Sequence, residues 1–388
     1  MKKDIAIHIM AALLLAFTSL PVCIAVDQGQ DKEEADKVPE RKLPELKKGE
    51  WEPLFELGEN IYPSIAISTA TLKAGIWDDN RHLGDNWGVV GVAVRGTADN
   101  CPVRVEVSGG NFIKPSVFTG TLADSKTVYC VYPDLRYEYE KLLNVKQTVP
   151  ETLSLKVTMG GGPQLEKTVR VQVRPVNECI SYFIDSSGNI NDVSALFAAY
   201  VNENHPAINR IMKDALTSKR ADSFAGYQGE ADDVMTEIEA IWDTLQKRGV
   251  RYSSIASSGE EDNPYIGSQH VRLLGESIRY TQANCVDSSV LMASIFRKIG
   301  LNTSLIILPD HMFVSVDLAA EGKKTVFIET TMLGEGSLEE AIEDGYEQFS
   351  KNKDKFDSRK EDEQDYNIVN IQEARAAGIM PIKDSSAD

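Results

Sequence analysis

The spacing of apolar residues changes near Asn177, and this change limits the fold of the chain more than any other feature. Before it, short alternating or β-branched runs are separated by turn residues, a pattern typical of strands: residues 65–70, 89–95, 103–107, 127–132, 153–159 and 168–173. After it, apolar residues recur at helical spacing over residues 190–200, 206–216 and 231–247. The sequence therefore predicts a β-sandwich followed by a domain of mixed helices and strands.

The length and composition of the chain fit two folded domains. Its 388 residues exceed one ordinary core, and 42% hydrophobic with 26% charged residues is typical of globular proteins. Residues 26–50 are almost all polar, which predicts a linker. We expect a signal peptide at 1–25, the linker at 26–50, an immunoglobulin-like β-sandwich at 51–176, and an α+β domain with a C-terminal extension at 177–388.

The N-terminus has the pattern of an export signal. Lys2 and Lys3 precede an apolar stretch over residues 5–26, like the charged and hydrophobic regions of secretory signals. We expect export to the periplasm or the cell surface. Three alternatives stay open: cleavage after Ala25, lipidation of Cys23, or an uncleaved anchor, since about 20 apolar residues can cross a bilayer. Membrane attachment is expected only through such a lipid or anchor.

The charge of the chain disfavours nucleic acid as a partner. The formal net charge is −18, whereas phosphate recognition depends on clustered Lys and Arg side chains. The same charge disfavours binding to anionic lipid headgroups. An excess of acidic residues is also the ordinary way to keep an exported protein soluble.

Four cysteines remain once residues 1–25 are removed: Cys101, Cys130, Cys179 and Cys285. In an oxidising compartment four cysteines can pair in three ways. Cys101 and Cys130 both fall at predicted strands, and we predict a disulfide between them. A bridged Cys285 could not act as a nucleophile.

The segment 284–300 is predicted to be a helix with a signal at each end. Asn284 can cap its start, Asp287 stands three residues later as in a capping box, and Gly300 suits a left-handed exit. Cys285 then lies on the first turn. The unpaired amides and the positive end of the helix dipole there favour a thiolate, the reactive form of cysteine.

Two predicted strands downstream bring a histidine and an acid together. Residues 311–318 and 325–330 flank a polar turn, and an antiparallel hairpin about this turn places Glu329 opposite His311 or within about three residues of it. A carboxylate there can orient the imidazole while the other ring nitrogen takes a proton from the thiol. Cys285, His311 and Glu329 therefore form a candidate catalytic triad.

Three motifs in this order resemble the transglutaminase-like superfamily, a branch of the papain-like cysteine protease fold with exported bacterial members. They are NCVD at 284–287 with its helix ending in RKIG, DHMFV at 310–314, and FIETT at 327–331. The resemblance covers roughly residues 242–334, and the family more often has Asp where this chain has Glu329. It also implies an oxyanion role for Gln269, beside the amide of Cys285. His270 is a rival base without a predicted acid partner.

These residues predict an exported, cysteine-dependent acyl-transfer enzyme that acts on amide bonds of a protein or peptide, cell-wall peptide among them. Hydrolysis is favoured over crosslinking because water is always at hand. We expect no cofactor and no metal, since the chain lacks the paired Cys and His spacing of zinc sites. The alternative is a noncatalytic cell-envelope binding protein with a degenerate transglutaminase-like scaffold.

Overall fold

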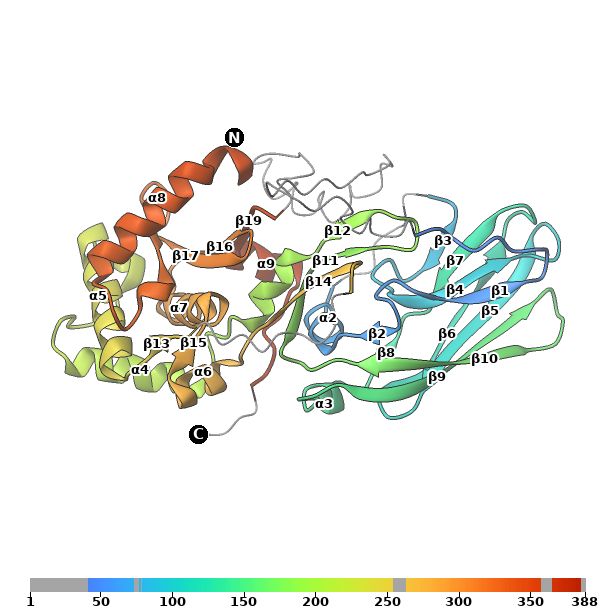
Figure 1. Cartoon of the computed structure of the whole chain (residues 1–388), viewed down its shortest axis with the longest axis horizontal. Coiled ribbons are helices and arrows are strands. Elements are labelled where there is room, and N and C mark those ends of the chain that lie inside the picture. The colour runs from blue at the N-terminus through green and yellow to red at the C-terminus, as the bar shows by residue number, and fades with distance from the viewer. Residues whose placement is uncertain (1–40, 73–76, 78, 254–262, 357–364, 385–388) are drawn as a thin grey trace, which may run out of the picture. The chain divides into compact units, whose positions relative to one another are not determined.

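The computed structural model describes residues 41–72, 77, 79–253, 263–356 and 365–384, and these form two compact units (Figure 1). Of the described residues, the first unit holds those up to Val193 and residues 263–268, and the second holds residues 194–253 and those from Gln269 onward. The predicted signal peptide and most of the predicted linker lie outside the described residues. No helix among the described residues has both the length and the apolar character needed to span a bilayer.

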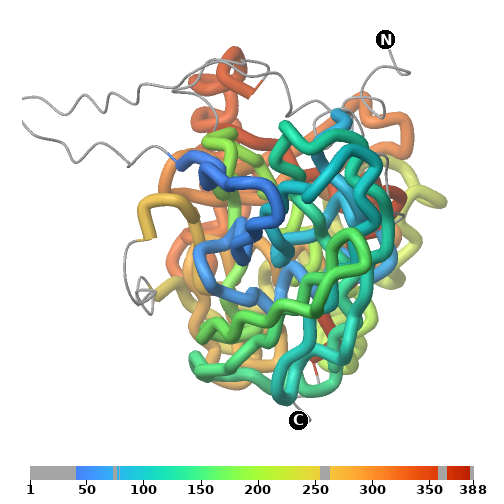
Figure 2. Tube along the Cα trace, turned by 90° about the vertical axis from the view of Figure 1, so that its right-hand side faces the viewer, coloured from blue at the N-terminus to red at the C-terminus, as the bar shows by residue number. Residues whose placement is uncertain are grey.

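The first unit contains two main sheets that share one apolar core. A four-stranded sheet has the order β1-β4-β7-β3, and a six-stranded sheet has the order β2-β10-β9-β5-β6-β8. The first comprises β1 (Trp51–Phe55), β3 (His82–Gly84), β4 (Val90–Arg95) and β7 (Val128–Tyr132). The second comprises β2 (Asn60–Ile61), β5 (Cys101–Gly109), β6 (Ile113–Leu122), β8 (Arg136–Tyr137), β9 (Val149–Met159) and β10 (Leu165–Val173). In the Cα trace of Figure 2 the chain of these two sheets is coloured from blue to green.

Period-two alternation explains how the two main sheets face each other. On β5, Val103, Val105 and Val107 are buried while the residues between them are more exposed. Leu153 and Leu155 of β9 are also fully buried in the same core. Burying one apolar face of each sheet is the main stabilisation available to such strands.

The remaining elements of the first unit include two short helices and a third sheet. The helices are α2 (Pro63–Ser68) and α3 (Tyr139–Leu142), and the third sheet has the order β12-β11-β14. Its strands are β11 (Glu178–Ile184), β12 (Ile190–Asp192) and β14 (Ile266–His270), the last of which leads into the second unit. The structural boundary therefore falls after Val193, beyond residue 176 where the sequence predicts it.

One predicted strand of the first unit is wrong. Residues 65–70 fall largely in the helix α2, which begins with Pro63 at its first turn. Ser64 donates its hydroxyl to the carbonyl of Glu178, 2.6 Å away and 114 residues along the chain. Local β-branched composition favours a strand here, but burial and this distant contact stabilise the helix instead.

The predicted disulfide between Cys101 and Cys130 is not formed, and both residues are free thiols. Cys101 packs in the core shared by the two sheets. On β7, Tyr129 and Val131 point into that core, while Cys130 points to the opposite face and packs with Leu54 and Tyr132. Because side chains alternate along a strand, the two sulfur atoms lie on different sides of the four-stranded sheet.

Alkylation of the native protein is expected to label Cys285 and to spare Cys101, Cys130 and Cys179. The last three are at most 2% exposed, whereas Cys285 is partly exposed. Burial raises the pKa of the Cys130 thiol to about 12 and that of Cys179 well above its usual range, so neither forms a thiolate near neutral pH. Peptide mapping of labelled protein, with a urea-unfolded sample as the control, checks this, and label on a buried cysteine would contradict it.

The second unit packs helices on a four-stranded sheet of order β18-β17-β16-β19. Its strands are β16 (Thr303–Leu308), β17 (His311–Asp317), β18 (Thr325–Ile328) and β19 (Asn367–Asn370), and a separate two-stranded sheet comprises β13 (Arg251–Tyr252) and β15 (Gln282–Ala283). Its helices are α4 (Pro206–Thr217), α5 (Ala231–Lys247), α6 (Leu274–Tyr280), α7 (Cys285–Ile299), α8 (Leu338–Phe356) and α9 (Ile371–Ala377), with 3-10 turns η1 (Ser194–Tyr200), η2 (Gly226–Gln228) and η3 (Thr330–Met332). Helix α7 packs on β16 and β17, and α8 packs on β18 (Figure 1).

Candidate active site

Helix α7 begins at Cys285, as its capping residues predict. The Asn284 side chain accepts from the amide of Asp287 at 2.8 Å, and the Asp287 carboxylate accepts from the amide of Asn284 at 3.2 Å. Gly300 ends the helix in the left-handed region, at φ 95°. Cys285 is thus the first helical residue and partly exposed, where the helix dipole favours negative charge.

Asp287 also ties the helix start to the segment after β14. Its side chain is fully buried, and it accepts from the Arg272 amide at 2.7 Å and from Arg272 Nη1 at 2.6 Å. A carboxylate buried in this way needs such donors to offset its desolvation. This ion pair fixes the first turn of α7, and with it the position of Cys285.

The hairpin of β17 and β18 brings His311 against Glu329. Its register pairs Val314 with Ile328 and Asp317 with Thr325, so Glu329 lies at the level of Phe313, two positions short of the level of His311. The two side chains span this offset, with His311 Nε2 2.7 Å from Glu329 Oε2. The prediction that the two residues meet across this turn is confirmed.

His311 lies between the cysteine and the acid. Burial lowers its pKa, but a hydrogen bond with the Cys285 side chain, together with the bond to Glu329 and the charges of both partners, raises the pKa of His311 to about 10. Because Nε2 faces Glu329, Nδ1 is the ring nitrogen left for Cys285. His311 is therefore an imidazolium at neutral pH, held between the two groups that the sequence assigns to the triad.

Glu329 is held by four donors. Its Oε1 accepts from the Thr331 amide at 2.9 Å and from Thr331 Oγ1 at 2.6 Å, while Oε2 accepts from His311 and from Gln348 Nε2 at 2.8 Å. Burial raises its pKa, but His311 and the bonds from Thr331 outweigh burial and lower the pKa below its usual value. Glu329 therefore stays ionised, although its side chain is only 2% exposed.

Gln348 on α8 is a positioning residue that the sequence did not reveal. Its amide donates to Glu329 and also to Asp344 Oδ2 at 3.0 Å, so the C-terminal extension supports the acid of the site. The backbone of α8 comes close to the hairpin because Gly345 lacks a Cβ, which would lie 2.7 Å from the carbonyl oxygen of Phe327. A glutamine in a charged helix carries no signal of this role.

Gln348→Ala is expected to shift the acidic limb of Cys285 reactivity upward by roughly half to one pH unit, because a lost donor is worth about 1 kcal/mol to the ionised carboxylate of Glu329. The measurement is the rate of Cys285 alkylation between pH 3 and 7. Asn352→Ala on the same helix is the matched control, since the Asn352 amide donates only to the carbonyl of Gln348 at 2.9 Å. Equal profiles for the two variants would contradict a role for Gln348.

A cluster of hydroxyl groups joins the three elements that carry the triad. Thr330 Oγ1 lies 2.9 Å from both Ser288 Oγ and Ser289 Oγ of α7. Ser289 Oγ also approaches the carbonyl of Cys285 at 2.7 Å and that of Met312 at 3.3 Å. Thr330 follows Glu329 and Met312 follows His311, so this cluster fixes the spacing of the triad from behind.

Thr330→Val is expected to lower the free energy of unfolding by about 1–2 kcal/mol, because it removes two buried hydrogen bonds to Ser288 and Ser289, which keep only their bonds to backbone carbonyls, and to slow Cys285 alkylation several-fold. Denaturant unfolding and alkylation rates check the two effects. Thr236→Val is the matched control, since the Thr236 hydroxyl donates only within α5, to the carbonyl of Asp232 at 2.9 Å. A change no larger than that of Thr236→Val would show that the cluster does not hold the site together.

Among the described residues, no hydrogen bond joins Gln269 to Cys285. It lies on β14, and its side-chain amide donates to the carbonyl of the neighbouring His270 at 3.1 Å. The oxyanion role of Gln269 therefore stays a prediction that rests on the resemblance. The amide of Cys285, at the start of a helix, is the other predicted donor.

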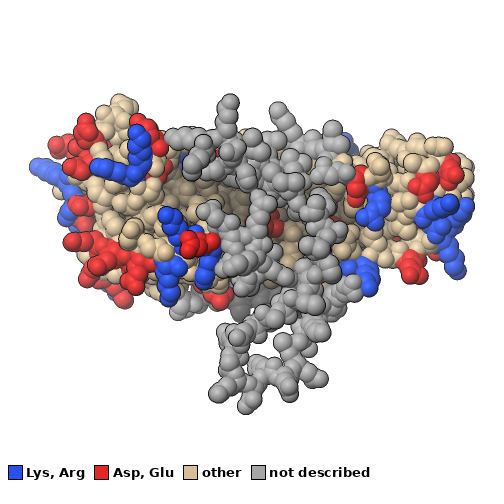
Figure 3. Space-filling model, turned by 90° about the horizontal axis from the view of Figure 1, so that it is seen from above, with Lys and Arg blue, Asp and Glu red and all other residues tan. Residues whose placement is uncertain are grey.

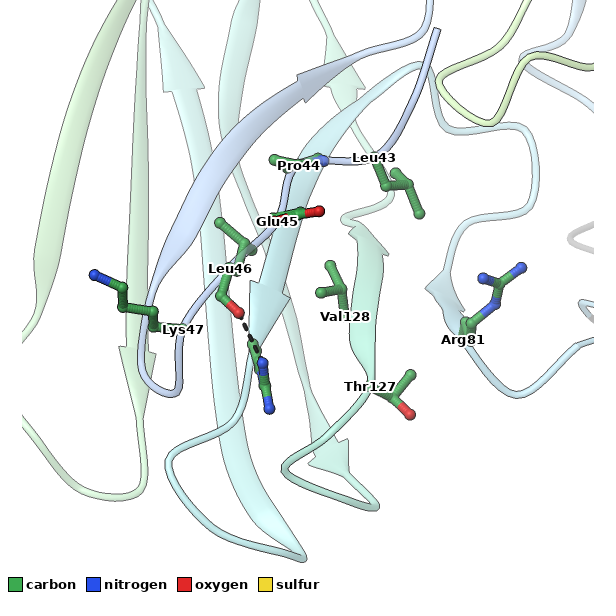
Figure 4. A pocket seen from close by; sticks show the side chains of 9 residues that line it. Leu43, Pro44, Glu45, Leu46, Lys47, Arg81, Thr127 and Val128 are labelled. Atoms are coloured by element: carbon green, nitrogen blue, oxygen red, sulfur yellow. Dashed lines mark hydrogen bonds between the residues drawn. The ribbon is translucent and has the colours of Figure 1, made fainter.

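A pocket of about 660 Å³ lies in the first unit and holds none of these groups (Figure 4). Its lining includes Arg95, whose guanidinium donates to the carbonyls of Ser125 at 2.8 Å and Leu46 at 2.9 Å. The one hydroxyl of its lining, on Thr127, donates to Asp124. The pocket thus has no nucleophile and base in contact.

Two further features bear on partners and metals. On the face shown in Figure 3, acidic and basic side chains of the described residues are interspersed without a continuous basic surface. Across the described ranges, no three His, Cys, Asp or Glu side chains are grouped so as to hold a metal ion.

Comparison with models of protein families and with curated proteins finds no significant match to the chain.

Proposed function

We propose that the second unit is a cysteine-dependent acyl-transfer enzyme that acts on amide bonds, with Cys285 as nucleophile, His311 as acid and base, and Glu329 as the group that orients His311. The observation that carries this proposal is the 2.7 Å contact of His311 Nε2 with Glu329, together with the effect of Cys285, at the start of α7, on the pKa of His311. Nucleophile, base and orienting acid in such contact are the signature of covalent acyl transfer.

The chemistry follows from the charges. The Cys285 thiolate forms a bond to the amide carbonyl carbon, and the negative charge moves to the carbonyl oxygen, beside the helix amides. His311 then gives its proton to the departing amine as the C–N bond breaks, which leaves a thioester. Neutral His311 next takes a proton from water, whose oxygen attacks the thioester, and the acid product leaves with Cys285 restored.

Hydrolysis of a peptide or protein is the reaction we propose, because Cys285 is partly exposed and water is always present. Crosslinking would instead need an amine site from which water is excluded. The resemblance to the transglutaminase-like superfamily agrees with either outcome. Under this proposal the first unit serves as a separate module, and export would place the enzyme where extracytoplasmic peptides are its substrates.

Acyl transfer from 4-nitrophenyl acetate to Cys285 tests the proposal. A burst of nitrophenol equal to the enzyme concentration, with one acetyl group on Cys285 by mass spectrometry, is the expected result. Cys285→Ala should abolish the burst. A fluorescent primary amine added to the reaction separates crosslinking from hydrolysis. If Cys285 is acetylated no faster in the native protein than in the urea-unfolded protein, the second unit is a binding scaffold and not an enzyme.

A further inference from the structure

Strand β13 lies directly beside the start of the helix that carries Cys285. It pairs in parallel with β15, with Tyr252 opposite Ala283. Ala283 is followed by Asn284 and then by Cys285. Because the two strands run in the same direction, the end of β13 and the start of α7 lie at the same edge of this small sheet.

The hydrogen bonds of β13 leave one residue available on its outer edge. The amide of Arg251 donates to the carbonyl of Thr281 at 3.1 Å, and that of Ser253 to the carbonyl of Ala283 at 2.9 Å. Backbone groups alternate in direction along a strand, so the N–H and C=O of Tyr252 point away from β15. Within the part of the chain that the structure describes, β15 is the one strand that pairs with β13.

The outer edge is closed just before Tyr252. A Cβ on Gly334 would lie 2.9 Å from the carbonyl oxygen of Val250 and 2.8 Å from Arg251 Cγ, so the backbone at Gly334 rests against those two residues. Pairing on this edge is therefore limited to Tyr252. One residue of an extended chain can exchange both of its backbone hydrogen bonds with a single strand residue.

The Tyr252 side chain also belongs to the site. It is 43% exposed, and burial of its hydroxyl together with the charges of Cys285 and Glu329 raises its pKa. Tyr252 pairs with Ala283, two residues before Cys285, and its strand contacts η3, which follows Glu329, so it lies close to the chain segments that carry the nucleophile and the acid. An exposed aromatic ring in this position offers a flat apolar wall to a bound chain.

We propose that Tyr252 is the substrate-docking residue of the site: its N–H and C=O pair with one residue of an extended peptide whose carbonyl then lies at Cys285, and its ring packs against that peptide. The inference rests on the proposed acyl-transfer function and adds the form of the substrate. The enzyme takes peptide backbone in an extended conformation, with little demand from side chains at the paired residue.

Acetyl-trialanine chloromethyl ketone tests the proposal, with chloroacetamide as the small reagent without a strand to dock. In both cases Cys285 sulfur bonds to the methylene carbon and chloride leaves. The measured quantity is the rate of the peptide reagent divided by that of chloroacetamide. This ratio is expected to be about tenfold higher for the native protein than for the urea-unfolded protein, a gain that one or two backbone hydrogen bonds would give. In a set of reagents that each carry one N-methylated peptide bond, the gain should be lost for the methyl group at one position and kept for the others.

Two variants separate the backbone of Tyr252 from its ring. Tyr252→Pro removes both the N–H and the ring but leaves the ladder to β15, which uses the amides of Arg251 and Ser253. Tyr252→Ala removes the ring and keeps the N–H, so the difference between these two variants reports the N–H. We expect the gain to disappear in Tyr252→Pro, to fall part of the way in Tyr252→Ala, and to be retained in Tyr252→Phe. Thermal melting verifies that each variant is folded.

Two outcomes would overturn the docking role of Tyr252 while leaving Cys285 reactive. Either the peptide reagent shows no gain in rate, or it shows a gain that neither N-methylation nor Tyr252→Pro reduces. Failure of the proposed function gives a different result. In that case chloroacetamide itself reacts no faster with native Cys285 than with the unfolded protein.

Discussion

His311→Ala is expected to slow alkylation of Cys285 by about a hundredfold or more at pH 6. An ordinary thiol, with a pKa of about 8.5, is only about 0.3% thiolate at that pH, and alkylating reagents attack the thiolate. Under the proposed function the imidazolium of His311, whose pKa Cys285 and Glu329 raise, is the positive charge that supports attack by Cys285. Iodoacetamide labelling from pH 5 to 11, followed by peptide mass spectrometry, measures the ratio of rates.

The pH dependence of this ratio has a definite sign. The pKa of His311 is raised to about 10, so the pair is intact below that value and loses its positive charge as the pH rises through it. The advantage of the wild type should therefore be large at pH 6, shrink as an ordinary thiol ionises, and vanish above pH 10. His270→Ala is the control histidine. A similar loss in His270→Ala, or a ratio near one at pH 6, would remove His311 from the site.

Glu329→Ala is expected to destabilise the protein by roughly 3–5 kcal/mol, as removal of one partner of a buried ion pair does. The variant leaves His311 without its carboxylate and Gln348 without an acceptor. The pKa of His311 should fall as well, because the charge of Glu329 is one of the causes that raise it. Denaturant unfolding at pH 7, and at pH values on either side of it, measures both effects.

Two milder replacements of Glu329 separate charge from shape. Glu329→Gln keeps the length of the side chain and should fold better than Glu329→Ala but lose the charge that holds His311 protonated. Glu329→Asp keeps the charge but is one methylene shorter, so it cannot hold Thr331 and reach His311 at once. We expect its alkylation rate near pH 6 to fall several-fold. If all three variants match the wild type in stability and rate, Glu329 has no part in the site.

The features that could be predicted from the sequence are those with local causes. The start and end of α7 follow from Asn284, Asp287 and Gly300, whose capping contacts lie within the helix termini. The contact of His311 with Glu329 follows from counting residues about a short turn, because the register of a hairpin is set by its turn.

The features that could not be predicted depend on contacts between distant segments. Residues 190–200 are predicted as a helix, but Ile190–Asp192 pairs with β11 and only Ser194–Tyr200 is helical, as a 3-10 turn. The roles of Gln348 and Tyr252 likewise appear only once α8 and β13 are placed beside the hairpin and the helix start. Neither residue lies in a sequence pattern that predicts such a role.

The support of Glu329 by α8 determines when, during synthesis of the chain, the candidate site becomes complete. Translation delivers the N-terminal part of a chain first, so Cys285, His311 and Glu329 all emerge before Gln348, and before β19 completes the edge of the sheet beside β16. Until then the acid lacks one of its four donors and the sheet has an open edge. The site as proposed would therefore be complete only once α8 has packed against the hairpin and β19 has paired with β16.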